Sequence, residues 1–485
     1  MYKKFSVILI LIAALIACSN GQSGNQSEPI VGSDSAEPAT KDAKIKISVE
    51  GINSGVAKLI GVFGDQNFIA DSAVINQDGS FIFERDSVYL AGLYFVVLPQ
   101  NQNFQMIVDA NQHFSMKTKK SDFVKNMEVT NSIDNTLLYQ SLVYQIDIDN
   151  KFGNIQRQLD AATKNSPEYL KIKAEQDQLV AERMAYIEGF RKSHPTAFFT
   201  KFKIAGQNPL VEEPKKKDGT LDTAMQTYLY RSKFWKDVDF SDERLLRTPV
   251  IHNKLKRYIL EITPQLQDSI IKSATIVTDL SKANKQMFKF VANWIALQFQ
   301  VGKTKMMGGE AVYVHMIDKY FTHELAFWSD STEIKGLRKQ ANELKASLLG
   351  QIGQDVKAKD QNGQYRSLYD LKSDYVLVYI YNPDCEHCQK ETPVVKRAWD
   401  KYKNKGFDVY AIATETDDSK WRAYIAKEKL AFTNVYDPTY ESKYYLKYHI
   451  DITPELYLLD KDRKIIAKNI NGEQLEELLS IKLGN

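Results

Sequence analysis

Cysteine is scarce in this sequence, which has only Cys18, Cys385 and Cys388 among 485 residues. An exported domain stapled by disulfides needs many more cysteines, so that class is excluded. Charge of one sign is scarce as well. The net charge is +3, which gives no reason to expect a nucleic acid or another polyanion as a partner. Because a single core stops growing well below this length, we expect two or three domains.

Metal and haem signatures are also missing. Cys385 and Cys388 form one Cys-x-x-Cys motif, but there is no second such motif and no neighbouring His-x-x-x-His that would complete a structural zinc site. Covalent haem needs a histidine directly after the second cysteine, where this chain has Gln389. We therefore expect no metal and no cofactor.

The N-terminus has the pattern of a secretory signal. Two lysines precede an apolar run from Phe5 to Ala17, which is too short to span a membrane comfortably as a mature helix. The run ends in Leu-Ile-Ala-Cys, residues 15–18, and resembles the lipobox of bacterial lipoproteins. The resemblance implies lipidation of Cys18 and anchoring in the cell envelope. Ser19 favours the outer membrane, and we expect the periplasmic face, although the other face stays open. An ordinary signal peptide with an incidental cysteine is the alternative.

Composition and periodicity divide the rest of the chain. After the signal segment 1–18, residues 19–43 are rich in Ser, Gly, Asn and Asp and predict a flexible tether. Residues 44–133 hold short apolar stretches between turn signals and predict an antiparallel β domain. Residues 134–350 change to helical periodicity and predict a mostly α-helical domain. Its long helical stretches are 136–162, 167–192, 283–302 and 333–349, with no proline after their first residue, and residues 208–222 are expected to form an exposed loop.

Residues 351–485 alternate between strand-like and helical segments, which favours an α/β domain around one sheet. Within it, Cys385 follows a continuous apolar strand and stands where a helical pattern begins. The unpaired N–H groups at a helix start carry partial positive charge, which stabilises a thiolate and lowers the cysteine pKa. The spacing places Cys388 one turn further on, near enough to attack a mixed disulfide formed on Cys385.

Three stretches resemble the TlpA/ResA-like branch of the thioredoxin superfamily. Residues 385–393, CEHCQKETP, are similar to the C-E-P-C-x-x-E-x-P of that branch, including a proline that kinks the active-site helix. Residues 452–454, Ile-Thr-Pro, resemble its cis-proline element, and residues 357–371 resemble its extra N-terminal hairpin. The resemblance implies a thioredoxin-like fold and a thiol-disulfide oxidoreductase over roughly residues 351–485. More loosely, the whole chain resembles Gram-negative lipoproteins with a β and a helical domain before this fold.

The resemblance also implies roles for individual residues. Cys385 is the expected attacking thiolate and Cys388 the resolving thiol. Glu391 is expected to modulate the thiol pKa values and proton transfer, with a plain surface acid as the alternative. Thr453 and Pro454 are expected to bind the substrate, Thr453 through its backbone and Pro454 as the cis turn.

Two neighbours of the cysteines are expected to act in opposite directions. Asp384 opposes formation of a thiolate, whereas His387 favours it when cationic. Asp384 has the alternative of capping the helix. The tryptophan that the family commonly has before the first cysteine is absent here. The sequence therefore leaves the reduction potential, and with it the direction of electron flow, open.

The sequence thus predicts thiol-disulfide exchange with exported proteins in the cell envelope. A membrane thiol relay is the implied source of electrons, and the lipid anchor the implied contact with the membrane. One alternative is a binding lipoprotein whose thioredoxin-like part is passive. Another is a peroxiredoxin-like thiol peroxidase, although the P-x-x-x-T/S-x-x-C approach to a peroxidatic cysteine is not found around Cys385. The client, the role of the first two domains and the oligomeric state stay open.

Overall fold

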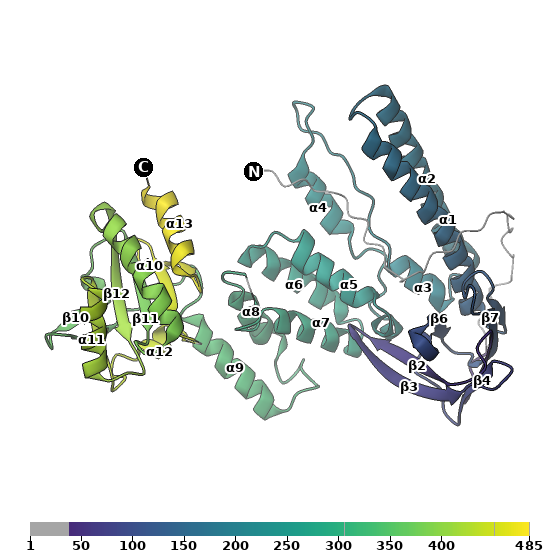
Figure 1. Cartoon of the computed structure of the whole chain (residues 1–485), viewed down its shortest axis with the longest axis horizontal. Helices are drawn as coiled ribbons and strands as arrows, with labels where there is room; N and C mark the ends of the chain where they lie inside the picture. The colour runs from purple at the N-terminus through teal and green to yellow at the C-terminus, as the bar shows by residue number, and fades with distance from the viewer. Residues whose placement is uncertain (1–37, 305, 451, 485) are drawn as a thin grey trace.

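A computed structural model describes residues 38–304, 306–450 and 452–484. The expected signal peptide, Cys18 and most of the expected tether lie outside these residues. A β region, a helical region and a C-terminal α/β domain follow one another along an elongated molecule (Figure 1). None of the helices that the structure describes is long and apolar enough to cross a membrane.

The β region consists of two four-stranded sheets. In β1, Ala43, Ile45, Ile47 and Val49 are buried while the residues between them are not, which is the alternation of a strand with one face in the core. One sheet has the order β4-β1-β7-β8, with β1 Ala43–Glu50, β4 Ser80–Arg85, β7 His113–Lys119 and β8 Glu128–Thr130. The other has the order β3-β2-β5-β6, with β2 Val56–Phe63, β3 Gln66–Val74, β5 Gly92–Val97 and β6 Asn103–Val108.

One strand pair differs from the predicted antiparallel arrangement. β1 and β7 run parallel, with Ile45 beside Phe114, whereas the other pairs in this region are antiparallel. A parallel pair requires a long crossover between its strands. The chain provides one here because all four strands of the second sheet lie between β1 and β7 in the sequence.

The helical region begins with a long hairpin of α1 Ile133–Ala161 and α2 Pro167–Ser193, which Ser132 and Ser166 cap. The four predicted helical stretches fall on α1, α2, α7 and α9, and the expected loop 208–222 is irregular apart from a bridge between Lys215 and Leu221. The other helices are α3 Phe198–Ala205, α4 Thr223–Lys233, α5 Val250–Lys256, α6 Gln267–Ser281, α7 Lys285–Gln298, α8 Glu310–Tyr320 and α9 Ser331–Lys345.

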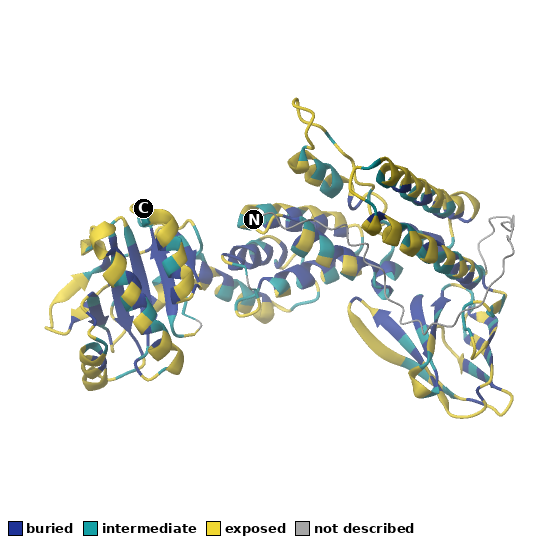
Figure 2. Cartoon of the chain, turned by 45° about the horizontal axis from the view of Figure 1, so that its top comes forward, coloured by how far each residue is buried: buried dark blue, intermediate teal, exposed yellow. Residues whose placement is uncertain are grey.

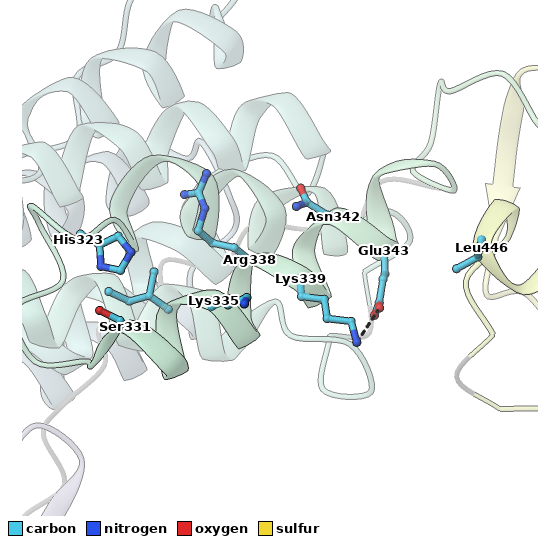
Figure 3. A pocket seen from close by; sticks show the side chains of 9 residues that line it. His323, Ser331, Lys335, Arg338, Lys339, Asn342, Glu343 and Leu446 are labelled. Atoms are coloured by element: carbon cyan, nitrogen blue, oxygen red, sulfur yellow. Dashed lines mark ion pairs between the residues drawn. The ribbon is translucent and has the colours of Figure 1, made fainter.

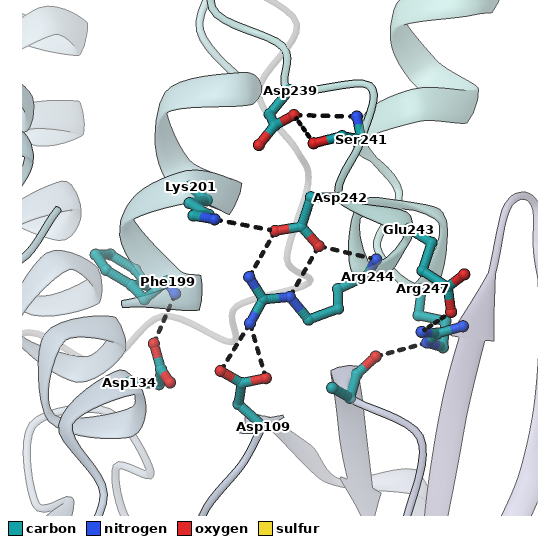
Figure 4. Close-up of polar contacts among 11 residues, drawn as sticks. Asp109, Asp134, Phe199, Lys201, Asp239, Ser241, Asp242, Glu243, Arg244 and Arg247 are labelled. Atoms are coloured by element: carbon teal, nitrogen blue, oxygen red, sulfur yellow. Dashed lines mark hydrogen bonds and ion pairs between the residues drawn. The ribbon is translucent and has the colours of Figure 1, made fainter. Parts of the chain in front are cut away.

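The β and helical regions share one hydrophobic core, to which buried residues from Ala43 in β1 to Leu344 in α9 contribute. Asn135 in α1 joins them by exchanging hydrogen bonds of 2.8 and 2.7 Å with the backbone of Ile107 in β6. Arg244 donates two hydrogen bonds of 2.9 Å to Asp109 and also pairs with Asp242 (Figure 4). The boundary between strands and helices near residue 133 therefore does not separate two hydrophobic cores.

The C-terminal domain has a seven-stranded sheet of order β10-β9-β13-β12-β11-β14-β15. Figure 2 shows its central strands buried beneath helices with exposed outer faces. The antiparallel hairpin of β9 and β10 lies where the sequence predicted one. The strands are β9 Lys357–Asp360, β10 Tyr365–Ser367, β11 Tyr375–Tyr381, β12 Phe407–Ala413, β13 Thr433–Tyr436, β14 Glu455–Leu459 and β15 Ile465–Lys468; the helices are α10 Glu386–Tyr402, α11 Asp418–Glu428, α12 Tyr444–Lys447 and α13 Gly472–Leu483.

The direction of these strands determines where a site can form. β11, β12 and β13 are parallel, and β14 runs antiparallel to β11. The carboxyl ends of the three parallel strands and the amino end of β14 therefore meet at one edge of the sheet. This active-site edge comprises the segments that follow Tyr381, Ala413 and Tyr436 and the segment that precedes Glu455.

The C-terminal domain is joined to the helical region by more than the connecting chain. Residues 350–353 pair with β15 through hydrogen bonds such as Gly350 N–H to Ile465 O, at 2.8 Å. Behind them, Glu310 at the start of α8 contacts Lys468 at 3.8 Å and also accepts a hydrogen bond from Asn469. Both charged side chains are almost fully buried, with exposed fractions of 1% for Lys468 and 2% for Glu310.

Candidate active site

The Cys-x-x-Cys motif lies where the sequence placed it, between a strand and a helix. β11 ends at Tyr381, and Cys385 is the N-cap residue of α10, with extended backbone angles. Its own N–H donates to Asn382 O at 3.1 Å. No side chain caps α10, so the N–H groups of its first turn are free to face the Cys385 sulfur. This arrangement explains why the first cysteine of the motif is the activated one.

The two cysteines differ in exposure. Cys385 is partly exposed, whereas Cys388 is fully buried, and the two thiols are not joined by a disulfide. Cys388 Sγ accepts a hydrogen bond from the backbone N–H of Asn382 at 3.4 Å. An incoming sulfur therefore reaches Cys385 first.

The pKa values of the two thiols are shifted in opposite directions. Burial raises the pKa of Cys385, but hydrogen bonds from the backbone N–H groups of Cys388 and His387 and from the Cys388 thiol outweigh it, so the net shift is downward. Burial raises the pKa of Cys388 to about 12. Cys385 is therefore the nucleophile of the reduced pair, and Cys388 holds its proton until the first step has occurred.

Thr453 and Pro454 lie against the first cysteine. Their peptide bond is cis, as the sequence predicted, and Thr453 O accepts a hydrogen bond from Cys385 Sγ at 3.4 Å. Both residues are partly buried, while the preceding Ile452 is 69% exposed. An extended chain that passes over this turn comes directly beside the Cys385 sulfur.

Asp384 and His387 are both exposed. Asp384 forms an ion pair of 2.9 Å with Lys420 of α11, and its N–H donates to Asn382 Oδ1 at 2.8 Å. The alternative that Asp384 caps α10 is wrong, because Cys385 occupies the cap position. Lys420 offsets part of the repulsion that Asp384 exerts on a thiolate. The effect expected of His387 stays a prediction.

Glu391 contacts the start of α13. Its carboxylate accepts a hydrogen bond from Gly472 N–H at 2.6 Å, at the start of α13. Glu391 lies on α10 one turn beyond Cys388, but the hydrogen bond that the structure gives it is to α13 and not to a thiol. Its expected effect on proton transfer therefore stays a prediction.

Several residues behind the buried cysteine carried no signal in the sequence. Thr392 donates to the carbonyl oxygen of Cys388 at 2.8 Å and shares a 2.7 Å hydrogen bond with the Tyr379 hydroxyl. Tyr381 stacks on Tyr379, with ring centroids 5.2 Å apart, and contacts the ring of Tyr424. The spacing of Thr392 four residues after Cys388 could have indicated the first contact, since a helical hydroxyl reaches that carbonyl. Nothing in the sequence indicates the tyrosine contacts.

Within the part of the chain that the structure describes, no group of three or more His, Cys, Asp or Glu side chains is placed to hold a metal ion. The active-site edge holds two thiols of unequal pKa beside a cis-proline turn.

Comparison with known proteins gives three findings. Residues 349–468 match the AhpC/TSA family. Over 132 residues the chain is 30% identical to the thiol-disulfide oxidoreductase ResA of Bacillus cereus, which covers 27% of this chain and 75% of that protein. Two solved structures are also similar. A thioredoxin-like protein from Bacteroides caccae has 19% identity, with 57% of this chain and 99% of that one covered and a TM-score of 0.45. A domain of a possible thiol-disulfide isomerase from Cytophaga hutchinsonii has 37% identity, with 28% of this chain and 92% of that one covered and a TM-score of 0.27.

Proposed function

Because this chain belongs to the TlpA/ResA-like thiol-disulfide oxidoreductases of the thioredoxin superfamily, we propose that it exchanges thiols and disulfides with exported proteins in the cell envelope. The observation that carries the proposal is the geometry of the cysteines. Cys385 is a partly exposed thiol of lowered pKa at a helix start, it contacts Thr453 O beside the cis-proline turn, and Cys388 is buried one turn away.

In the reducing direction, the Cys385 thiolate attacks one sulfur of a client disulfide. A bond forms between Cys385 Sγ and that sulfur, and the client's other sulfur leaves as a thiolate that takes up a proton. The N–H groups at the start of α10 stabilise the attacking thiolate. The turn at Thr453 and Pro454 positions the extended client chain next to Cys385.

Cys388 completes the exchange. It loses its proton, attacks Cys385 Sγ and forms the Cys385–Cys388 disulfide, and the client's second sulfur leaves as a thiol. Two electrons have then passed from the two cysteines to the client. Burial of Cys388 delays this step until the mixed disulfide exists, because its pKa of about 12 keeps it protonated in the free dithiol. The oxidising direction is the reverse sequence.

The protein must be anchored where it can reach both a client protein and a redox partner. The signal-like N-terminus and the Leu-Ile-Ala-Cys motif support a lipid anchor at Cys18 and an outer-membrane protein facing the periplasm. A membrane thiol relay would regenerate the reduced pair there. The β and helical regions would set the distance and orientation of the active-site edge.

The test is to trap the mixed disulfide in cells. A Cys388→Ala variant cannot resolve the intermediate, so we expect it to accumulate client proteins bound through Cys385 that a reductant releases. Cys385→Ala and the double variant are the controls and should trap nothing. If Cys388→Ala traps no protein and the purified pair forms no disulfide in glutathione buffers, the domain is a passive module and the proposal fails. Rapid consumption of hydrogen peroxide by the dithiol form would instead favour the peroxidase alternative.

A further inference from the structure

The sheet of β3, β2, β5 and β6 has an apolar outward face. Ala57 and Leu59 of β2 are fully buried in the core, so the residues that alternate with them lie on the other side of the sheet. Residues paired directly across antiparallel strands share a face. The register therefore gives the outward face the side chains of Val56, Ile60, Ile69, Val74, Phe95 and Val97. An antiparallel sheet that packs on one side normally carries polar side chains on the other, and this one does not.

The helical region covers only one end of this outward face. There Leu93 and Ile107 are buried, and Asn135 of α1 binds the backbone of Ile107. Away from that end, Ile69 is 64% exposed and Val74 is 73% exposed. Figure 2 shows that exposed residues extend along β3. Exposed apolar side chains that lie together in this way mark an interaction site.

Charged side chains are nearly missing from the outward face. The four strands, all of whose residues are described, contain only Lys58 and Asp71. Lys58 is exposed on the outward face and forms no ion pair with any residue that the structure describes. Asp71 lies on the other face, where its carboxylate accepts a hydrogen bond from the buried Tyr89. The loops 51–55 and 98–102, at the exposed end of these strands, contain no charged residue.

The surface of the helical region differs in this respect. Along α9, Figure 3 shows the side chains of Lys335, Arg338, Lys339 and Glu343. Side chains of this kind are strongly hydrated and suit a surface that stays in water. The outward face of the sheet, in contrast, is stabilised when it is removed from water.

The single charge on the outward face favours lipid over a second copy of the chain. A two-fold dimer formed through this face would bring two Lys58 side chains together, with no carboxylate on the face to pair with them. A phospholipid surface offers an apolar boundary for the aliphatic side chains and anionic headgroups for Lys58. The composition of the face therefore matches a membrane surface.

The expected lipid anchor leaves enough chain for the face to reach the membrane. Pro38 is the first described residue and follows Cys18 by about 20 positions, which can span up to about 70 Å. β1 has 8 residues and leads from this end of the chain toward β2 and the exposed end of the sheet, a distance of about 26 Å. The reach of the anchor therefore exceeds the length that the β region has to turn through.

We propose that the outward face of this sheet docks the protein on the surface of the membrane that holds its lipid anchor, with Lys58 at the anionic headgroups. The inference rests on the anchor of the proposed function and not on the exchange chemistry. The β region and the C-terminal domain lie at opposite ends of the molecule (Figure 1). Docking thus holds the active-site edge away from the lipid, where soluble client proteins can reach it.

The test measures how the chain without its lipid, residues 19–485, binds vesicles of phosphatidylethanolamine and phosphatidylglycerol. This chain keeps every residue that the structure describes. Flotation in a density gradient gives the partition coefficient. We expect the double variant Ile69→Ser, Val74→Ser to lower it about tenfold, because two exposed apolar side chains lose their contact with lipid. Lys58→Gln should lower it about fivefold on these vesicles and have no effect on vesicles of phosphatidylcholine alone.

A matched control makes the same replacements in the helical region. Leu170 is 57% exposed and Val211 is 55% exposed, so their side chains are as accessible as those of the sheet face. The double variant Leu170→Ser, Val211→Ser should leave the partition coefficient unchanged. Absence of vesicle binding by the unmodified chain, or an equal loss in both double variants, would overturn the docking proposal.

Two further measurements separate this proposal from its alternatives. Sedimentation velocity without lipid should show no dimer that depends on the face; a dimer that Ile69→Ser, Val74→Ser dissociates would assign the face to a second copy and overturn docking on lipid. Reduction of hydroxyethyl disulfide, measured on the same preparations, should be equal in all variants because none of them changes a residue of the active-site edge. Its absence from the unmodified chain would overturn the proposed exchange and leave the result for the vesicles standing.

Discussion

At the scale of single residues, the two cysteines are chemically unequal although only two residues separate them. Cys385 has the N-cap position and the hydrogen bonds of the first turn, whereas Cys388 is inside the core formed by α10 and the sheet. The order of events in exchange follows from this difference. The thiolate forms on the exposed sulfur, and the buried one acts second.

Alkylation of the reduced protein tests this asymmetry. At neutral pH we expect iodoacetamide to modify Cys385 at least about tenfold faster than Cys388, because only the thiolate reacts and the thiolate fractions of the two differ strongly. The rate at Cys385 should fall as the pH is lowered through its depressed pKa, where the thiolate becomes protonated, while Cys388 stays slow until the pH nears its pKa of about 12. Peptide mapping after timed quenching measures both rates. Preferential labelling of Cys388 would contradict the assignment.

The sequence was informative about these cysteines but less so about their neighbours. Asp384 was expected to oppose the thiolate, and its position beside Cys385 is visible in the sequence. Its partner Lys420 is not, because α11 reaches the active-site edge only through the order of the strands. The charge that Cys385 experiences is therefore the sum of a local residue and a distant one.

At the scale of secondary-structure elements, α10 and α13 are joined side by side. Glu391 accepts from Gly472 N–H at the start of α13, and Glu476 of α13 pairs with Arg397 at 3.3 Å and with Lys401 at 3.0 Å. α10 carries the cysteines, so α13 supports the helix that positions them. The family resemblance implied a role for Glu391 in proton transfer, but the structure adds a role as a capping group.

Two variants of Glu391 separate these roles. Glu391→Ala removes the acceptor at the start of α13, and we expect it to lower the free energy of unfolding by about 1 kcal/mol, as for the loss of other helix caps. Glu391→Gln keeps an acceptor oxygen and should be close to the unmodified chain in stability. Denaturant unfolding measures the stability of both variants. The reduction potential of the cysteine pair is measured in each of them as well. A changed potential in Glu391→Gln at unchanged stability would show that the carboxylate also tunes the thiols.

At the scale of the whole molecule, the helical region and the C-terminal domain are held together by a buried charge pair. Burial lowers the pKa of Lys468, whereas the carboxylates of Glu310 and Glu455 act to raise it. Glu455 directly follows Pro454, so this cluster extends from the active-site edge to the first turn of α8. An ion in such a place is tolerated only while its partner is present.

Removing one partner should therefore be far more harmful than removing both. We expect Glu310→Ala to lower the free energy of unfolding by about 3 kcal/mol, because Lys468 then loses its ion-pair partner and keeps only the carboxylate of Glu455. The double variant Glu310→Met, Lys468→Met keeps the volume and removes both charges, so it should recover most of that loss. Guanidinium unfolding followed by tyrosine and tryptophan fluorescence measures both. Equal losses in the two variants would mean that packing, and not charge, holds the interface.

The sequence by itself determined the features that depend on neighbouring residues. The helical and strand periods, the strand-to-helix position of Cys385 and the hairpin near residue 360 follow from patterns within a few residues of each other. So does the placement of the cis-proline turn at Thr453 and Pro454, through its motif. The thioredoxin-like fold of the C-terminal domain could be predicted for the same reason.

Only the tertiary structure decided which distant residues meet. The parallel pairing of β1 with β7, the core shared by the β and helical regions, and the contacts of Glu391, Asp384 and Glu310 all join segments far apart in the chain. Such contacts depend on strand order and helix packing, which bring together side chains that no local pattern relates.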